Sequence, residues 1–188
     1  ILRENRINYF ILGNGSNIIL NDREYDGAVI RLNQLNGIEL HPQMEMVYAE
    51  AGAFLPKLVI ETVKASLTGL EFAEGIPGSV GGSIYGNAGA YNACLLDYVS
   101  SVTVLDEDLN IKVIEHEEIE YGYRTSCFKE NKKYIIVAAK FFLKMGDKEN
   151  SLAIMADRKR RRLESQPLEF PSAGSVFRNP EGDYAGRL

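Results

Sequence analysis

Residues 13–17 read Gly-Asn-Gly-Ser-Asn and have the composition of a loop that could hold a phosphate group. Glycines let consecutive backbone N–H groups converge on an anion, and serine and asparagine side chains add further donors. The loop has neither the lysine of a Walker motif nor the glycine spacing of a dinucleotide-binding fingerprint that enters a helix. A Gly-Asn-Gly turn between two strands is also a common structural element, so both interpretations stay open. The candidate contacts are Gly13, Asn14, Gly15, Ser16 and Asn17.

A second glycine-rich stretch spans residues 75–82 and is followed by Asn-Ala-Gly-Ala-Tyr at residues 87–91. Flexible glycines around a rigid proline suit the approach of backbone to a flat ligand better than they suit a core element. The alternative is a tight crossover packed against a strand. Two such loops about 60 residues apart fit a diphosphate-bearing cofactor better than either loop alone. The candidate contacts are Gly75, Ile76, Pro77, Gly78, Ser79, Gly81, Gly82, Asn87, Gly89, Ala90 and Tyr91.

Arg124 and Ser175 stand in settings where each could act on a substrate. Arg124 lies among aromatic and hydroxyl groups in Tyr-Gly-Tyr-Arg-Thr-Ser. A guanidinium can hold a carboxylate bidentately and stabilise negative charge that develops there. A surface arginine leaning on tyrosines is the alternative. Ser175 lies between glycine and an apolar pair, and no His/Asp pattern marks it as a nucleophile. Its hydroxyl could still serve as a proton donor.

Apolar runs bounded by turn residues predict the strands that must position these groups. The apolar run at residues 9–12 resumes at residues 18–20, after the first glycine-rich turn. The predicted strands cover residues 9–12, 27–32, 47–51 and 134–143, with a hairpin formed by residues 99–105 and 111–114.

Two segments have helical spacing. In the first, Pro56 suits the opening turn and Gly69 is expected to close the helix. Its apolar face is formed by Leu55, Leu58, Val59, Thr62 and Val63. The second is a charged amphipathic helix at residues 151–165 that ends before Pro167. Strands and helices mix without strict alternation, which favours an α+β fold.

The composition is that of a globular protein, with 45% hydrophobic and 25% charged residues among 188. The net charge of −5 excludes a basic nucleic-acid footprint, and the basic run at residues 158–162 fits a solvated helix face or an anion site. No apolar run approaches the roughly 20 residues of a membrane span, and no signal peptide is visible. Cys94 and Cys127 are expected to be free thiols of a cytoplasmic protein. His41 and His116 are too isolated for a metal site.

The four chemistry-bearing segments, in this order, resemble the UDP-N-acetylenolpyruvoylglucosamine reductases, also called UDP-N-acetylmuramate dehydrogenases. The resemblance runs over essentially the whole chain. The two glycine-rich loops are shared more loosely with other flavoproteins of this FAD-binding fold. Tyr-Arg-x-Ser-x-Phe at 123–128 and Gly-Ser-Val-Phe-Arg-Asn-Pro at 174–180 are far more specific, and residues 166–175 match the shorter variant of the family.

The resemblance implies FAD held between two subdomains and a third domain that covers a sugar nucleotide. Residues 1–145 would then be the FAD-binding region and residues 146–188 the start of the substrate-binding domain. Both ends of the family's chain would be missing, including the beginning of the N-terminal subdomain and a catalytic glutamate expected beyond Leu188. A fragment of this kind is expected to be inactive alone.

The activity implied is NADPH- and FAD-dependent reduction of the enolpyruvyl ether of a UDP-sugar, a cytoplasmic step of peptidoglycan synthesis. Carried over by motif, Ser175 is the proton donor, Arg124 stabilises the enolate, Tyr123 lies beside the flavin and Asn179 contacts the substrate. The resemblance implies no nucleic-acid, membrane or protein partner. There are two alternatives: another FAD oxidoreductase that acts on a different substrate, and a relative that binds nucleotide without catalysis.

Two structural expectations follow. The loops at 13–17 and 75–82 should lie on one side of a shared cleft, because one ligand would use both. The segment after about residue 146 should pack poorly, because only the first elements of a third domain would be present.

Overall fold

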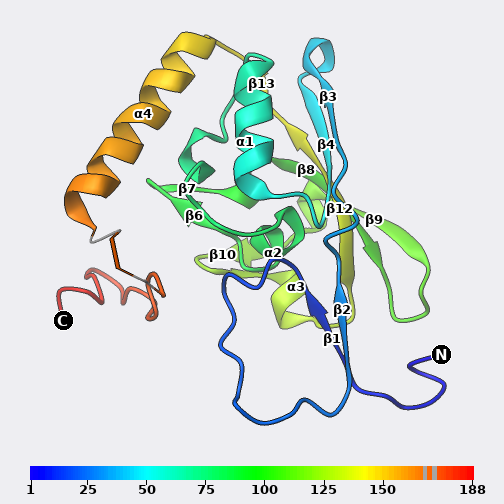
Figure 1. Ribbon diagram of the computed structural model, residues 1–188. Coiled ribbons are helices and arrows are strands. Elements are labelled where there is room, and N and C mark those ends of the chain that lie inside the picture. Colours follow the sequence, from blue (N-terminus) through cyan, green and yellow to red (C-terminus); the bar gives the residue numbers. More distant parts are fainter. Residues whose placement is uncertain (167–168, 171–172) are drawn as a thin grey trace.

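The structure is a computed structural model that describes residues 1–166, 169–170 and 173–188. At its centre is an antiparallel five-stranded sheet in the order β3–β4–β12–β8–β9 (Figure 1). Its two longest strands are rich in valine, isoleucine and phenylalanine, which suit a half-buried pleated surface. The strands are β3 (Ile38–His41), β4 (Met46–Glu50), β8 (Val99–Leu105), β9 (Ile111–Glu115) and β12 (Ile135–Phe142).

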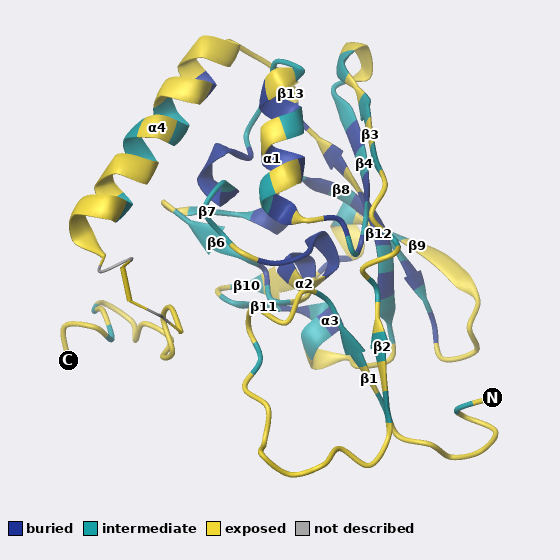
Figure 2. Cartoon of the chain, viewed as in Figure 1, coloured by how far each residue is buried: buried dark blue, intermediate teal, exposed yellow. Residues whose placement is uncertain are grey.

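The core lies where the helices α1 (Leu55–Lys64) and α2 (Val80–Tyr85) meet this sheet, as the buried residues in Figure 2 show. Helix α1 buries Leu55, Leu58, Val59, Thr62 and Val63, which confirms the predicted face. Helix α2 packs against β12 and β4. Mixed helices and antiparallel strands confirm the α+β fold class.

The end predicted for α1 was wrong. The helix ends at Lys64 rather than near Gly69. Ser66 then takes a positive φ of 60°, and the short strand β5 (Leu67–Thr68) pairs with β13 (Lys144–Met145). The chain leaves the helix early because Leu67 is buried in this pairing. Gly69, with a φ of 126°, instead turns the chain after β5.

A separate parallel pair, β1 (Tyr9–Leu12) and β2 (Ala28–Arg31), brackets the first glycine-rich loop. Both strands were predicted. The apolar run at 18–20 forms no strand, and Ile19 and Leu20 are 90% and 77% exposed.

Short elements complete the fold around α2. The hairpin β10 (Tyr121–Gly122) and β11 (Thr125–Ser126) leads into α3 (Cys127–Glu130). A second hairpin joins β6 (Gly89–Ala90) to β7 (Ala93–Cys94). The 3-10 helices are η1 (Pro42–Met44), η2 (Glu71–Ala73), η3 (Leu95–Tyr98) and η4 (His116–Glu118).

Helix α4 (Lys148–Ser165) begins three residues earlier than predicted because Asp147 caps it by accepting a hydrogen bond from the backbone N–H of Glu149 at 2.9 Å. Pro167, predicted to follow its end, lies outside the described residues. Among the described residues after 146, Ser151 alone is buried, so the expectation of poor packing is confirmed. No helix in the described part of the chain is long and apolar enough to cross a membrane.

Candidate functional site

The two glycine-rich loops are in contact, which confirms that they lie on the same side of the molecule. The Ser16 hydroxyl donates a hydrogen bond to the carbonyl of Pro77 at 3.0 Å. A Cβ added to Gly13 would lie 2.4 Å from the Ser79 Oγ, and one added to Gly78 would lie 3.1 Å from the Ser16 Oγ. The close approach therefore depends on glycine in both loops.

The loop at residues 13–17 presents unused backbone donors. None of its five N–H groups donates a hydrogen bond to another described residue. Gly15 has a φ of 75°, which is the left-handed conformation that turns successive N–H groups toward one side. The loop therefore has the chemistry of an anion cradle.

Other glycines of the second stretch serve packing. Gly81 lies against the end of β4, where its N–H donates to the carbonyl of Ala51 at 2.8 Å and an added Cβ would meet the Ala51 Cβ at 2.8 Å. A Cβ on Gly89 would lie 2.6 Å from the carbonyl oxygen of Ala93 across the β6–β7 hairpin. For these two positions the tight-crossover interpretation accounts for the glycine.

Asn87 connects the second glycine-rich stretch to the β10–β11 hairpin, which carries Arg124. Its side chain is buried, donates to the carbonyl of Gly122 at 2.9 Å and accepts from the backbone N–H of Leu96 at 3.3 Å. Both ends of the amide are thus committed within the protein. The Asn87 side chain, which was predicted as a ligand contact, positions the β10–β11 hairpin.

Arg124 occupies the two-residue turn of that hairpin, with a φ of 60°. Its guanidinium carbon lies 5.5 Å from the centroid of the Tyr123 ring. The hairpin is anchored on α2, because the Ser126 hydroxyl donates to the carbonyl of Tyr85 at 2.8 Å. This strained turn at the edge of α2 holds both predicted residues, with Tyr123 57% exposed and Arg124 partly exposed.

The segment at residues 173–180 reaches the same hairpin through Arg178. The Arg178 Nη2 donates to the backbone carbonyl of Arg124 at 3.3 Å, and the Lys129 Nζ donates to that oxygen at 3.2 Å. Ser175 is exposed, and Asn179 accepts from the backbone N–H of Ala185 at 3.0 Å. The two most distinctive motifs therefore meet at the Arg124 carbonyl. The sequence pattern did not single out Arg178, although it lies inside the second motif.

Burial and acidic neighbours keep the nearby titratable groups protonated. Burial raises the pKa of Tyr121, and Asp97, which accepts from its hydroxyl at 3.2 Å, adds to the shift. Burial likewise raises the pKa of the Cys94 and Cys127 thiols. Both cysteines are free, as predicted.

Comparison with known proteins identifies the cofactor class of this region. The family described as "FAD binding domain" matches residues 1–113. The chain belongs to this FAD-binding domain family. The match includes both glycine-rich loops and ends in β9.

Relatives of this FAD-binding chain agree with the resemblance seen in its sequence. It is 45% identical over 188 residues to the UDP-N-acetylenolpyruvoylglucosamine reductase of Clostridium novyi (strain NT), covering 100% of the chain and 60% of the relative. The crystal structure of UDP-N-acetylenolpyruvylglucosamine reductase (MurB) from Thermus caldophilus superposes with a TM-score of 0.83 at 34% identity, covering 98% of this chain and 66% of that one. The chain spans about 60% of the length of the curated relatives it matches.

A more distant structure shares the fold alone. A variant of Phl p 4 described as a glucose oxidase has a TM-score of 0.56 at 14% identity, covering 78% of this chain and 32% of that one.

Helix α4 supplies contacts that the sequence did not predict. Along one face, the Ser151 hydroxyl donates to Glu71 at 2.6 Å, the Arg158 guanidinium carbon lies 4.6 Å from the Tyr91 ring centroid, and the Arg162 Nη1 donates to the Gly75 carbonyl at 2.6 Å. The two arginines thus join α4 to the second glycine-rich stretch, where Gly75 and Tyr91 were predicted ligand contacts.

Replacing Glu71 by alanine is expected to lower the free energy of unfolding by about 1–3 kcal/mol. The buried carboxylate also accepts from the backbone N–H of Gly69 at 2.9 Å, so its loss leaves two donors without their partner. Urea denaturation followed by circular dichroism measures the change. Glu74→Ala, which removes a partly exposed carboxylate three residues away, is the matched control. Equal stability of the two variants would show that the Ser151–Glu71 contact does not hold α4.

Proposed function

We propose that the chain is the FAD-binding part of an NADPH-dependent reductase. The reaction is reduction of the enolpyruvyl group of UDP-N-acetylglucosamine enolpyruvate to UDP-N-acetylmuramate, a cytoplasmic step of peptidoglycan synthesis. The observation that carries the proposal is the contact between the two distinctive motifs, in which Arg178 bonds the carbonyl of Arg124. The curated relatives that bear the reductase name over the whole chain support it.

The two glycine-rich loops fit FAD. A diphosphate needs converging N–H donors, and residues 13–17 offer five that no other described residue uses. Gly13 and Gly78 keep the two loops close enough to contact one ligand. The proposed contacts are Gly13, Asn14, Gly15, Ser16, Asn17, Gly75, Ile76, Pro77, Gly78, Ser79, Gly81, Gly82, Asn87, Gly89, Ala90, Tyr91 and Tyr123.

FAD, when bound, supplies the hydride that the enolpyruvyl group accepts. Arg124 would stabilise the negative charge that develops on the substrate carboxylate as the double bond is lost, because its guanidinium is planar and stays charged. Ser175 would deliver a proton from its hydroxyl to the adjacent carbon, which completes the addition. Asn179 would contact the substrate. No residue of this chain is assigned the role of the catalytic glutamate.

Residues 1–145 form the proposed FAD-binding region, and residues 146–188 begin the substrate-binding domain. The boundary follows β13, after which α4 leaves the sheet. The low burial beyond it agrees with a domain whose remaining elements are needed to cover α4.

A visible absorption spectrum of the whole protein tests the function. We expect flavin bands that bleach when NADPH is added and return when the enolpyruvyl substrate follows. Bleaching without recovery would point to a flavin oxidoreductase with another substrate, and absence of flavin bands would contradict the cofactor site.

Replacing Gly13 by alanine is expected to weaken FAD binding about tenfold or more. The new Cβ would lie 2.4 Å from the Ser79 Oγ, so this hydroxyl would have to move and would lose the hydrogen bond that it accepts from the Gly82 N–H in the second stretch. Quenching of flavin fluorescence on binding measures the affinity. In Gly86→Ala the added Cβ would lie 3.6 Å from the Gly82 carbonyl, an ordinary contact, and FAD affinity should be retained. Unchanged affinity in Gly13→Ala would remove the first loop from the FAD site.

A further inference from the structure

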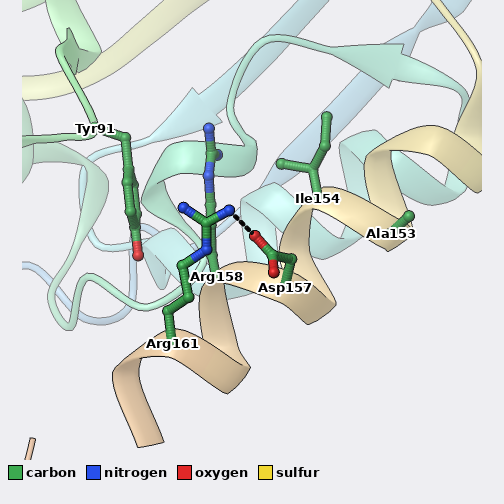
Figure 3. Close-up of a pocket in the computed structure, with 6 residues that line it drawn as sticks. All are labelled: Tyr91, Ala153, Ile154, Asp157, Arg158 and Arg161. Atoms are coloured by element: carbon green, nitrogen blue, oxygen red, sulfur yellow. Dashed lines mark ion pairs between the residues drawn. The ribbon is translucent and has the colours of Figure 1, made fainter. Parts of the chain in front are cut away.

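A pocket lies between α4 and the β6–β7 turn, away from the loop at 13–17 and the Arg124 hairpin, and it shares Tyr91 with the proposed FAD contacts (Figure 3). Its volume is about 470 Å³. The lining residues are Tyr91, Ala153, Ile154, Asp157, Arg158 and Arg161. Two arginines and an aromatic ring therefore face one space.

The arginines of α4 differ in whether a carboxylate pairs with their charge. Arg160 pairs with Asp157 at 2.7 Å and with Glu164 at 2.8 Å, and Arg161 pairs with Asp157 at 2.5 Å. Arg158 makes no ion pair or hydrogen bond with any residue that the structure describes, and its contact is the face of the Tyr91 ring. Stacking on a ring leaves the N–H edge of a guanidinium able to donate.

Asp157 offsets only part of the positive charge at the pocket. Hydrogen bonds from Arg160 and then Arg161 hold the pKa of Asp157 below its ordinary value, so this carboxylate is ionised at neutral pH. One negative and two positive side chains then line the space, because Arg160 is not among its lining residues. The net positive charge of the lining favours an anionic ligand, and Arg158 is the cation whose charge is not paired with a described carboxylate.

Tyr91 is held toward α4 at a conformational cost. It has a φ of 54° and its neighbour Asn92 a φ of 60°, which is the left-handed region in the turn of the β6–β7 hairpin. A bulky residue rarely adopts this conformation, and strain of this kind collects at ligand sites. The turn places the Tyr91 ring alongside the Arg158 and Arg161 side chains (Figure 3).

We propose that this pocket binds the phosphoryl groups of a nucleotide, with Arg158 and Arg161 donating to their oxygens beside the Tyr91 ring. The choice of a nucleotide rests on the proposed function, in which both NADPH and the UDP-sugar carry a diphosphate. Arginine suits this role because its planar N–H fork matches two phosphate oxygens at once.

Isothermal titration of the chain with inorganic pyrophosphate, in the presence of excess FAD, tests the site. We expect Arg158→Ala to lower the affinity about tenfold or more and Arg160→Ala to leave it within about twofold. Both variants remove one positive charge from α4, so a general charge effect would lower affinity equally. No pyrophosphate binding, or equal losses in the two variants, would overturn the proposal.

Competition then distinguishes the source of the phosphate. Displacement of pyrophosphate by UDP assigns the pocket to the sugar nucleotide, and displacement by NADP⁺ assigns it to NADPH. Displacement by neither would refute a nucleotide site. The flavin spectrum of the same samples reports on FAD separately, so loss of FAD with retained pyrophosphate binding counts against the proposed function and not against this pocket.

Discussion

Ser175→Ala in the whole protein is expected to slow consumption of the enolpyruvyl substrate by about two to four orders of magnitude. The alanine lacks the hydroxyl that would deliver the proton to the substrate carbon. The step that consumes NADPH needs no such proton, and it should proceed at nearly the parent rate. Stopped-flow absorbance separates the two steps, because flavin bleaching reports the first and recovery reports the second.

The variant should remain folded, because Ser175 is exposed. Ser165→Ala is the matched control, since it also removes an exposed hydroxyl, one that donates only to the carbonyl of Arg161 at 2.7 Å. If Ser175→Ala consumes substrate at the parent rate, Ser175 is not the proton donor. Its place between glycine and an apolar pair would then reflect only a small residue tolerated beside a turn.

Local periodicity explains why part of the fold could be predicted. The face of α1 and the β8–β9 hairpin depend on neighbours in the sequence, and both were predicted with nearly the observed bounds. Strand β3 was missed although Ile38 and Leu40 alternate with exposed residues, a period-two signal. Only two of its four residues are apolar, whereas β1, which is equally short, is an unbroken apolar run.

Contacts between distant segments explain most of what the sequence did not predict. The early end of α1 depends on Leu67 pairing with Met145, far along the chain. Arg162 meets the carbonyl of Gly75, and a backbone acceptor has no signature in side-chain types. The basic run was predicted as a solvated face or an anion site. The structure shows both situations in this run, because Arg160 forms ion pairs within the helix and Arg158 lines a pocket.

The candidate site was predicted more fully than the packing around it. Glycine-rich loops and unusual motifs mark chemistry directly, and the two loops do meet through Ser16 and Pro77. Composition alone could not separate glycines that leave room for a ligand from glycines that leave room for the protein. Gly81 belongs to the second kind, because Ala51 occupies the space where its side chain would lie.

Arg124→Lys in the whole protein is expected to lower kcat by about 10²- to 10³-fold, with a smaller effect on KM. Lysine keeps the positive charge but loses the planar pair of donors that an enolate carboxylate requires. The backbone φ of 60° is equally unfavourable for lysine, and the bonds that Lys129 and Arg178 donate go to the main-chain carbonyl. The substitution therefore changes the guanidinium while the hairpin is held as before. Steady-state kinetics with varied enolpyruvyl substrate measure the two parameters.

Arg160→Lys makes the same chemical change on the exposed face of α4, away from the hairpin, and should leave turnover intact. A second comparison separates stabilisation of developing charge from simple binding. If Arg124 only held the carboxylate of the unreacted substrate, the lysine variant would raise KM and keep kcat, because an interaction made equally before and during the reaction does not change the barrier from the bound state. A fall in kcat that excess substrate cannot restore is the result that places the guanidinium against the charge formed during reduction.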